Sequence, residues 1–542
     1  MTDQTISPAH SAYRDRVVYA LSKLGDPDAV QARLAPYAEA LLELWQLDLE
    51  PCRALLMACR ATSPHGSRPW EPVLILRCLL LAMLVGTPAL NAFAKRLRSD
   101  PVLQLLAGVG DKDDDGGVQK TPSIGTFYDF LHRLHDGPRA HRGIERESEL
   151  LRRRSQEPRK RNQPDHGRKT KAEKKKAQQE VANQAKDATA KLVKILQSSR
   201  HNRRPQDLAR RLSELHWRCG VLESARRGLF EIPRGLPLVA DGTPLPTAAS
   251  GHGKRVCDCP RAKKCDCERV WPDPTATRGY DSYRDTYFYG YNLYEIGTVS
   301  DGAHLPLMLR LNPSNRVDHL TGAEALEDLG KLLRDDFPDI IAPRFFVADC
   351  GHDALANHEH IRSWGLRPII PLRGDAPAEH PERDGLLLSP RAIPLCQAKV
   401  EMAAWGTCDA NTALFICPVK AKKLEKCPLA PPDQPDWLCE PESARGPVVA
   451  LNVNDNPRLF PIVPRNSPAY ERLYKQRSSC ERSNSIKKQA LDLLSCRHRR
   501  WSFWFIRATF AALLQHARVW VRDIDAQAWL RDLIAGACAR AA

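Results

Sequence analysis

Hydrophobic positions recur every three or four residues in the first quarter of the chain, and this spacing indicates helices. From residue 236 onward, short apolar or alternating runs of the kind typical of strands replace that period. The helices predicted for the first part cover 41–47, 73–84, 90–97, 101–106 and 124–134. The later strands cover 236–241, 286–298, 305–311, 344–349 and 368–371, with helices over 323–333 and 354–364. The pattern therefore predicts an N-terminal helical domain followed by an α/β domain.

Changes in composition divide the chain into five parts. The parts are an N-terminal helical domain (1–140), a basic linker or solvated helix (141–205) that is most helical over 171–197, a first part of the α/β core (206–374), an insertion (375–450) and a second part of the core (451–542). The first part of the core opens with an amphipathic helix over 206–230. The insertion is rich in Pro and Cys and has no clear period, although strands are expected near 412–417 and 447–453.

The 542-residue chain carries a formal net charge of +16, and much of this excess is local. Residues 152–176 contain twelve Lys and Arg against three Asp and Glu. A basic excess of this size favours a polyanionic partner, of which nucleic acid is the simplest. The same stretch also fits a solubilising linker, so it predicts no sequence specificity.

Targeting and membrane signals are not expected. The first residues lack an apolar signal segment, and the most apolar stretches, 73–85 and 503–514, are short and contain Arg77 and Arg507. We therefore expect a soluble, cytoplasmic protein without a membrane partner. Its seventeen cysteines are then expected as thiols or metal ligands rather than disulfides.

Four cysteines lie within eleven residues in the first part of the core: Cys257, Cys259, Cys265 and Cys267. Four thiolates can surround one tetrahedral Zn²⁺, so the cluster predicts a structural zinc site. The alternative is a surface loop with reduced thiols. A second, widely spaced group predicts no definite ligand set and comprises Cys396, Cys408, Cys417, Cys427 and Cys439.

The stretch after Ser467-Pro468 combines a helix start with charged residues at helical spacing. Relative to Glu481, Tyr474 lies seven residues before, Arg477 four before and Lys488 seven after. Offsets of four and seven return to nearly the same side of a helix, so a continuous helix would carry all four on one face. The alternative is a charged, solvated helix face.

Two further carboxylates, Asp241 and Asp349, each end an apolar run, LPLVAD and RFFVAD. We expect each at the C-terminal end of a buried strand, where functional groups of α/β sheets tend to lie. Taken singly, each Asp also fits a turn or a helix cap. Together with Glu481 they can hold Mg²⁺ against a phosphodiester, because hard cations prefer carboxylate oxygens.

The spacing Tyr-x2-Arg-x3-Glu-x6-Lys resembles the YREK signature of bacterial insertion-sequence transposases with a DDE catalytic site on an RNase H-like core. The resemblance extends over residues 236–520 and, more weakly, 60–135, and the predicted β-β-β-α-β-α-β order is similar to the family core. It implies that Asp241, Asp349 and Glu481 are catalytic Mg²⁺ ligands. It also implies that Tyr474, Arg477 and Lys488 bind DNA phosphates near the cleaved end. His352 departs from the family, whose members often carry Tyr at this position.

The resemblance implies an Mg²⁺-dependent DNA transposase that cuts and joins the ends of an insertion sequence. Its partners would be double-stranded DNA, the terminal inverted repeats of its own element and target DNA, bound by a homodimer in the nucleoid. The N-terminal helical domain would contribute to binding the repeats. Three arginines just beyond the Glu481 helix, Arg497, Arg499 and Arg500, are further candidates for phosphate contact. The alternatives are a metal-dependent nuclease without strand transfer and a non-catalytic DNA-binding protein derived from a transposase.

Overall fold

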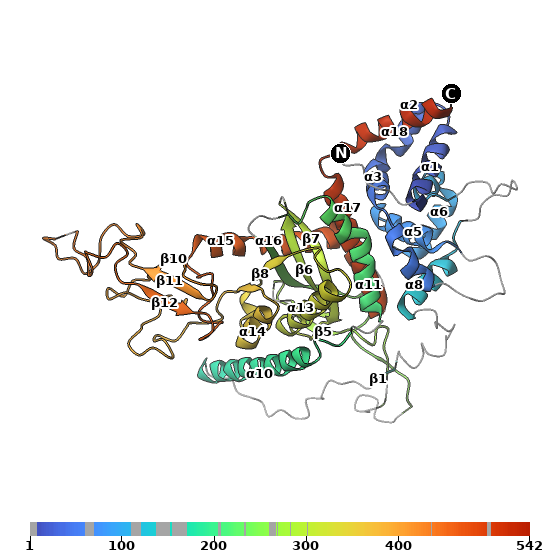
Figure 1. The fold of residues 1–542 in the computed structure, drawn as a ribbon. Coiled ribbons are helices and arrows are strands. Elements are labelled where there is room, and N and C mark those ends of the chain that lie inside the picture. The colour runs from blue at the N-terminus through green and yellow to red at the C-terminus, as the bar shows by residue number, and fades with distance from the viewer. Residues whose placement is uncertain are drawn as a thin grey trace.

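The computed structural model describes most of the chain in three connected regions. It covers residues 8–59, 70–109, 121–136, 152–153, 171–203, 207–231, 235–258, 267, 269–281, 283–300, 302–434, 436–495 and 500–541. A helical region lies at one end, a mixed sheet in the middle and a small three-stranded sheet at the other end (Figure 1). The protein is therefore a mixed α/β molecule, as the pattern predicts.

The helical region combines both ends of the described chain. Its N-terminal helices are α1 (Pro8–Ser22), α2 (Pro27–Leu34), α3 (Ala38–Gln46), α4 (Arg53–Ala58), α5 (Pro72–Leu84), α6 (Leu90–Ser99), α7 (Pro101–Ala107) and α8 (Ile124–Asp136). The C-terminal helices α17 (Trp501–Val521) and α18 (Ala526–Ala541) pack against α1, α2, α3 and α5. One apolar core unites them, and α5 is buried along almost its whole length. Both ends of the chain lie in this region (Figure 1).

The central sheet contains the five predicted strands in their predicted order and one further strand, β5, that was not predicted. Its strands are β2 (Leu236–Pro246), β5 (Thr277–Asp281), β6 (Thr286–Ser300), β7 (Ala303–Pro313), β8 (Pro343–Val347) and β9 (Arg367–Ile369). β6 pairs antiparallel with β2, β5 and β7, whereas β8 pairs in parallel with both β2 and β9. The sheet is therefore mixed, with β2 between an antiparallel and a parallel neighbour.

Helices cover both faces of this sheet. Since side chains alternate along each strand, β2 contributes apolar side chains to both faces. Leu238 and Ala240 of β2 point into a core shared with α13 (Asp318–Asp335) and α14 (Leu355–Ser363). Val239 points to the opposite face, where Tyr470 and Cys480 of α15 (Pro468–Lys475) and α16 (Ser478–Ser485) pack. By this alternation Asp241 also belongs to the α15–α16 face.

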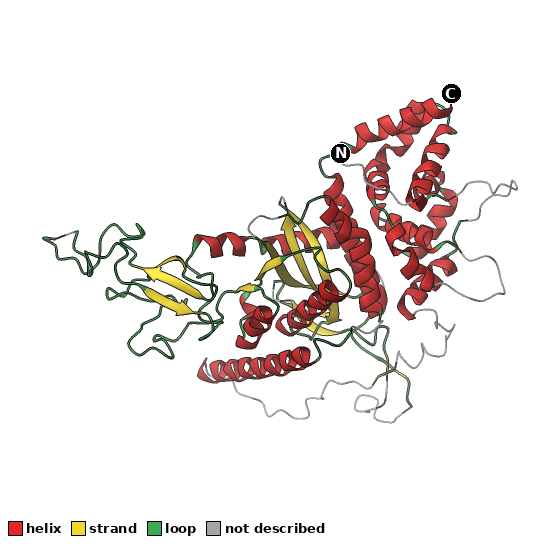
Figure 2. Cartoon of the chain, in the orientation of Figure 1, coloured by secondary structure: helices red, strands yellow, loops and turns green. Residues whose placement is uncertain are grey.

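The remaining elements flank the sheet. The basic linker ends in α10 (Lys171–Ser198), which lies along α13 and α14 (Figure 1). The next segment comprises α11 (Leu208–His216), a π-helix (Trp217–Val221) and α12 (Leu222–Arg226). Within the insertion, β10 (Ala403–Thr407), β11 (Thr412–Ile416) and β12 (Val449–Asn452) form an antiparallel sheet, and long loops make up most of the rest (Figure 2). A small sheet joins β1 (Arg152–Arg153), β4 (Arg269–Val270) and β3 (Lys254–Arg255).

The structure corrects the sequence analysis at two places that affect the site. The helix predicted through Glu481 is not continuous: α15 ends at Lys475, α16 starts at Ser478, and a π-helix spans Ile486–Ala490. Asp241 lies in the middle of β2 rather than at its end, because pairing with β6 continues to Pro246. Asp349 lies two residues beyond the end of β8, as expected.

Candidate functional site

Asp241 is a mostly buried carboxylate on the α15–α16 face of the sheet. The pKa of Asp241 is raised to about 6, chiefly by burial and also by the nearby carboxylates of Asp318 and Asp349, while the charge of Arg477 opposes the rise. A buried carboxylate near other carboxylates favours a neighbouring positive charge. The position is therefore suited to binding a cation.

Asp349 is held by a buried hydrogen-bonded chain. Nδ1 of His352 lies 2.8 Å from Oδ1 of Asp349, and Nε2 of the same ring lies 2.8 Å from the hydroxyl of Tyr294. An ionised carboxylate can only accept, so Nδ1 of His352 donates to Asp349, and in the neutral ring Nε2 accepts the proton of Tyr294. Burial alone would raise the pKa of Asp349, but His352, Arg477 and the N–H of Gly351 hold it below its usual value. Asp349 therefore stays ionised and fixed in orientation.

Arg477 lies between the carboxylates that the sequence singled out. Its Nη2 atom lies 3.6 Å from Oδ1 of Asp241, and its Nη1 atom donates to Oε1 of Glu481 at 3.2 Å. Burial would lower the pKa of Arg477, but the charges of Asp241 and Asp349 raise it. The break between α15 and α16 lies at this residue, which is the N-cap of α16. The guanidinium thus neutralises the site from its centre.

Tyr474 and Lys488 complete the group predicted from spacing. The ring of Tyr474 stacks on Tyr470, with 6.0 Å between the ring centroids. Burial raises the pKa of the Tyr474 hydroxyl, and the negative charge of Asp349 also raises it. Nζ of Lys488 donates to the hydroxyl of Thr243 on β2 at 2.5 Å. The pKa of Lys488 is lowered to about 8, chiefly by burial and also by the charge of Arg284. The structure thus gathers all four around the same part of β2, although the helix that carries them is broken.

Asp318, the first residue of α13, belongs to the site but was missed by sequence reasoning. The side-chain amide of Asn292 donates a hydrogen bond to the Asp318 carboxylate. Burial raises the pKa of Asp318, and the negative charge of Asp349 also raises it. Asp318 approaches β2 from the α13 side: a Cβ atom on Gly242 would lie 2.5 Å from its Oδ1 atom, so a side chain at position 242 would displace this carboxylate. The only local signal was an acidic residue at a helix start, which usually indicates a cap. Tyr294, within an aromatic strand, was equally hidden.

The residues fit a divalent cation in chemistry, although they do not surround a vacant position. Within the described ranges, no group of three or more His, Cys, Asp or Glu side chains is arranged to hold a metal ion. The guanidinium of Arg477 lies where positive charge is needed, between Asp241 and Glu481. The Glu481 side chain is 61% exposed and can move with it. Binding of Mg²⁺ by Asp241, Asp349 and Glu481 therefore requires Arg477 to change partners.

Several predicted residues lie wholly or partly outside the described ranges. Cys259 and Cys265 of the proposed zinc cluster are not described, nor are Arg497 and Arg499. Cys257 and Cys267 flank the undescribed segment, and Arg500 precedes α17, with its guanidinium 6.0 Å from the ring of Phe503.

In the second cysteine group, four members lie near one another. Burial raises the pKa of Cys439, and the neighbouring thiols raise it further; these are Cys427, Cys417 and Cys396.

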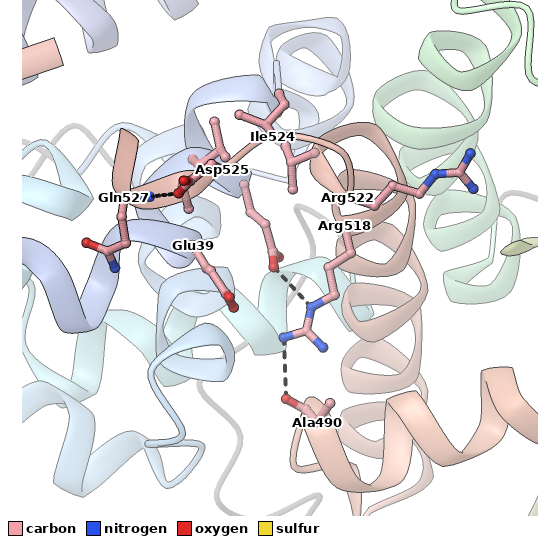
Figure 3. Close-up of a pocket in the computed structure, with 11 residues that line it drawn as sticks. Glu39, Ala490, Arg518, Arg522, Ile524, Asp525 and Gln527 are labelled. Atoms are coloured by element: carbon pink, nitrogen blue, oxygen red, sulfur yellow. Dashed lines mark hydrogen bonds and ion pairs between the residues drawn. The ribbon is translucent and has the colours of Figure 1, made fainter. Parts of the chain in front are cut away.

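A separate cavity of about 630 Å³ lies between α3, the turn joining α17 to α18, and the end of the π-helix (Figure 3). Nε of Arg518 donates to Glu43 at 3.0 Å, and its Nη2 reaches the carbonyl of Ala490 at 3.5 Å. Burial raises the pKa of Glu43 to about 7 despite this partner. The cavity thus marks a polar contact between the helical region and the segment that carries Lys488.

Comparisons with known proteins neither identify nor contradict this site. No model of a protein family matches the chain, and no curated protein sequence matches it. No helix within the described ranges is long and apolar enough to cross a membrane. The case for a function therefore rests on the residues and their geometry.

Proposed function

We propose that this protein is a DNA transposase of the DDE class, with an RNase H-like core, that cuts and joins the ends of an insertion sequence. The observation that carries the proposal is the convergence of Asp241, Asp349 and Glu481, from two strand regions and a helix, around Arg477. The order β2, β6, β7, α13, β8, α14, β9 supports the core assignment, since it repeats the β-β-β-α-β-α-β order of the resemblance once the additional strand β5 at the edge of the sheet is set aside.

In this proposal each residue has a separate task. Asp241, Asp349 and Glu481 would hold Mg²⁺, which when bound activates water or a 3′-hydroxyl and stabilises the leaving oxygen. His352 keeps Asp349 oriented. Arg477 leaves the carboxylates and pairs with a phosphate of the DNA end, because a guanidinium binds phosphate in two-point geometry. Lys488 and Tyr474 hold the neighbouring backbone.

The proposed partners follow from this reaction. They are double-stranded DNA with the terminal inverted repeats of the element, and target DNA, bound by a homodimer in the cytoplasm. The twelve Lys and Arg within residues 152–176 and the net charge of +16 support a nucleic-acid partner.

The test uses DNA that contains the sequences flanking the gene. Wild-type protein with Mg²⁺ should release the end and join it to a second duplex. Asp241→Ala, Asp349→Ala and Glu481→Gln should each lower cleavage by at least a hundredfold while affinity for the end changes less than about threefold, because each removes a metal ligand and no phosphate contact. Near wild-type cleavage by any variant would remove that residue from the catalytic set.

Two other results would select the alternative functions. Cleavage without joining, under conditions where a pre-cut end is also not joined, indicates a nuclease. Tight binding to the end without cleavage in Mg²⁺ or Mn²⁺ indicates a DNA-binding protein derived from a transposase.

We also propose a structural Zn²⁺ held by Cys257, Cys259, Cys265 and Cys267. Purified full-length protein should contain about one zinc per chain, which Cys257→Ser with Cys259→Ser should remove. Protein prepared without chelators that contains no zinc would rule the site out.

A further inference from the structure

A buried polar network lies behind Glu481. The inner side of α16 and of the π-helix Ile486–Ala490 presents Ser479, Ser483 and Lys487 to the sheet, and all three residues are buried. A helix face turned to a sheet is ordinarily apolar, so a polar inner face calls for a reason. The partners of these residues supply it.

The centre of the network is an ion pair between a strand and the helix. Nζ of Lys487 lies 2.7 Å from Oε2 of Glu295, and both side chains are only 1% exposed. Ser483 donates to the other carboxylate oxygen at 2.7 Å, and Nε2 of His304 lies 2.9 Å from the same atom. The positive charge of Lys487 and the hydrogen bonds lower the pKa of Glu295 even though burial opposes them. Glu295 is therefore ionised.

Further bonds join this pair to two other elements. Nδ1 of His304 on β7 lies 2.9 Å from the hydroxyl of Ser479. Gln515 of α17 bonds to Ser483 at 2.9 Å, to Lys487 at 3.2 Å and to the carbonyl of His304 at 2.9 Å. Three successive turns of the segment that carries Glu481 are thus attached to β6, β7 and α17.

The network also touches the site through the sheet. Glu295 lies directly opposite Asp241 in the antiparallel register of β2 and β6, so both side chains point to the same face. Asp241 faces the candidate metal position, whereas Glu295 is neutralised by Lys487. The ion pair thereby connects the strand that carries one carboxylate to the helix that carries another.

We infer that Glu295 and Lys487 are positioning residues that fix the register of α16 on the sheet, and so place Glu481 opposite Asp241. Apolar contacts are not directional and allow a helix to slide or rotate, whereas a buried ion pair with directional hydrogen bonds forms in one register only. Replacing a buried ion pair by neutral groups often leaves stability unchanged, so such a pair can be kept for specificity. The π-helix Ile486–Ala490 contributes to this positioning because it carries two adjacent lysines: Lys487 points inward to Glu295, and Lys488 reaches Thr243.

This inference rests on the proposed function for the role of Glu481, but the position of α16 can be measured without DNA. Cys480, next to Glu481, is fully buried, whereas Cys350 and Cys408 are exposed. A thiol reagent followed by peptide mass mapping therefore reports whether α16 leaves the sheet. Exposed cysteines in the same sample calibrate the reagent.

The decisive variant is the double substitution Glu295→Gln with Lys487→Met. Glu295→Gln alone would leave the Lys487 ammonium buried without its partner, and Lys487→Met alone would leave the Glu295 carboxylate in the same state. We expect a melting temperature near that of wild type, labelling of Cys480 at least tenfold faster, and cleavage at least tenfold slower with a higher Mg²⁺ requirement. Affinity for the DNA end should change less than about twofold. Lys475→Met, which removes an exposed lysine of α15, is the control for labelling and stability.

Each outcome decides a separate point. Wild-type labelling and wild-type cleavage in a stable double variant would overturn the inference. If the double variant does not fold, Ser483→Ala removes one hydroxyl of the network, and unchanged Cys480 labelling and cleavage in that variant would overturn it equally. If wild-type protein does not cleave DNA, the proposed function fails, while Cys480 labelling still decides whether the pair holds α16.

Discussion

At the scale of single residues, Arg477 holds the key position of the site. It contacts Asp241 and Glu481 in the free protein, where it supplies the positive charge that three carboxylates require. The proposed reaction gives it a second partner, the phosphate of the DNA end. Exchange between these partners would couple DNA binding to metal binding, because the carboxylates are released as the guanidinium moves.

The first prediction concerns phosphate contact. Arg477→Ala and Lys488→Ala should each weaken binding of the cleaved end and lower the slope of log affinity against log salt by about one, since each removes one phosphate contact. Affinity measured over a salt series checks this. Arg531→Ala, which removes an exposed arginine of α18, should leave the slope unchanged. If both site variants match wild type in affinity and slope, neither residue contacts phosphate.

At the scale of elements, the start of α13 packs against β2 without spare room. Asp318 begins the helix, and its carboxylate occupies the space that a side chain at Gly242 would need. The strand that carries Asp241 and the helix that carries Asp318 are therefore held at one separation. Adding a single methyl group at this contact should therefore displace both the strand and the helix.

Gly242→Ala should destabilise the protein by about 1–3 kcal/mol, the usual cost of an extra carbon in a filled space. Thermal unfolding measures the effect, and cleavage should fall as Asp241 shifts. Gly536→Ala in α18 is the matched control, because a Cβ atom there meets nothing within 4 Å and alanine favours a helix. A stable Gly242→Ala variant would show that Asp318 can move away from β2.

At the scale of the whole molecule, the two ends of the chain meet in the helical region and reach the site through α17. Gln515 of α17 joins the network behind Glu481, and Arg518, one turn later, bonds to Glu43 of α3 and to Ala490 (Figure 3). The helical region is thus attached to the segment that carries Glu481 and Lys488 by polar contacts at two levels. Binding of DNA repeats by that region would act on the same helix.

Glu43 predicts a dependence of stability on pH. Its pKa in the folded protein is raised from about 4.5 to about 7 by burial, so its contribution is fully present below pH 4.5 and is lost as pH rises through 7. The free energy of unfolding should fall over this range by up to about 3 kcal/mol from this group. Denaturant unfolding between pH 5 and 8 measures it. Glu43→Gln should remove the slope, and Glu39→Gln, an exposed carboxylate one turn away, should keep it.

Local pattern was sufficient for most elements of the core. The apolar run 344–349 predicted β8 (Pro343–Val347), and the helical period in 73–84 predicted α5 (Pro72–Leu84). Both predictions succeed because the pattern of apolar residues close together in the sequence indicates which side of an element, or which short run, is buried. The spacing around Glu481 also selected residues that the fold gathers. It did so despite a wrong premise, since the helix breaks at Arg477 and widens after Ser485.

The sequence by itself predicted most elements of the central sheet, their order and the carboxylates to test. Tertiary structure alone decided that Asp241 lies within a strand, that Asp318 joins it, that Arg477 stands between Asp241 and Glu481, and that Lys487 is buried against Glu295. The physical reason is distance along the chain. Periodicity reports which side of an element is buried, whereas an ion pair such as Lys487–Glu295 depends on which distant strand the helix meets, and no local pattern of charges specifies that partner.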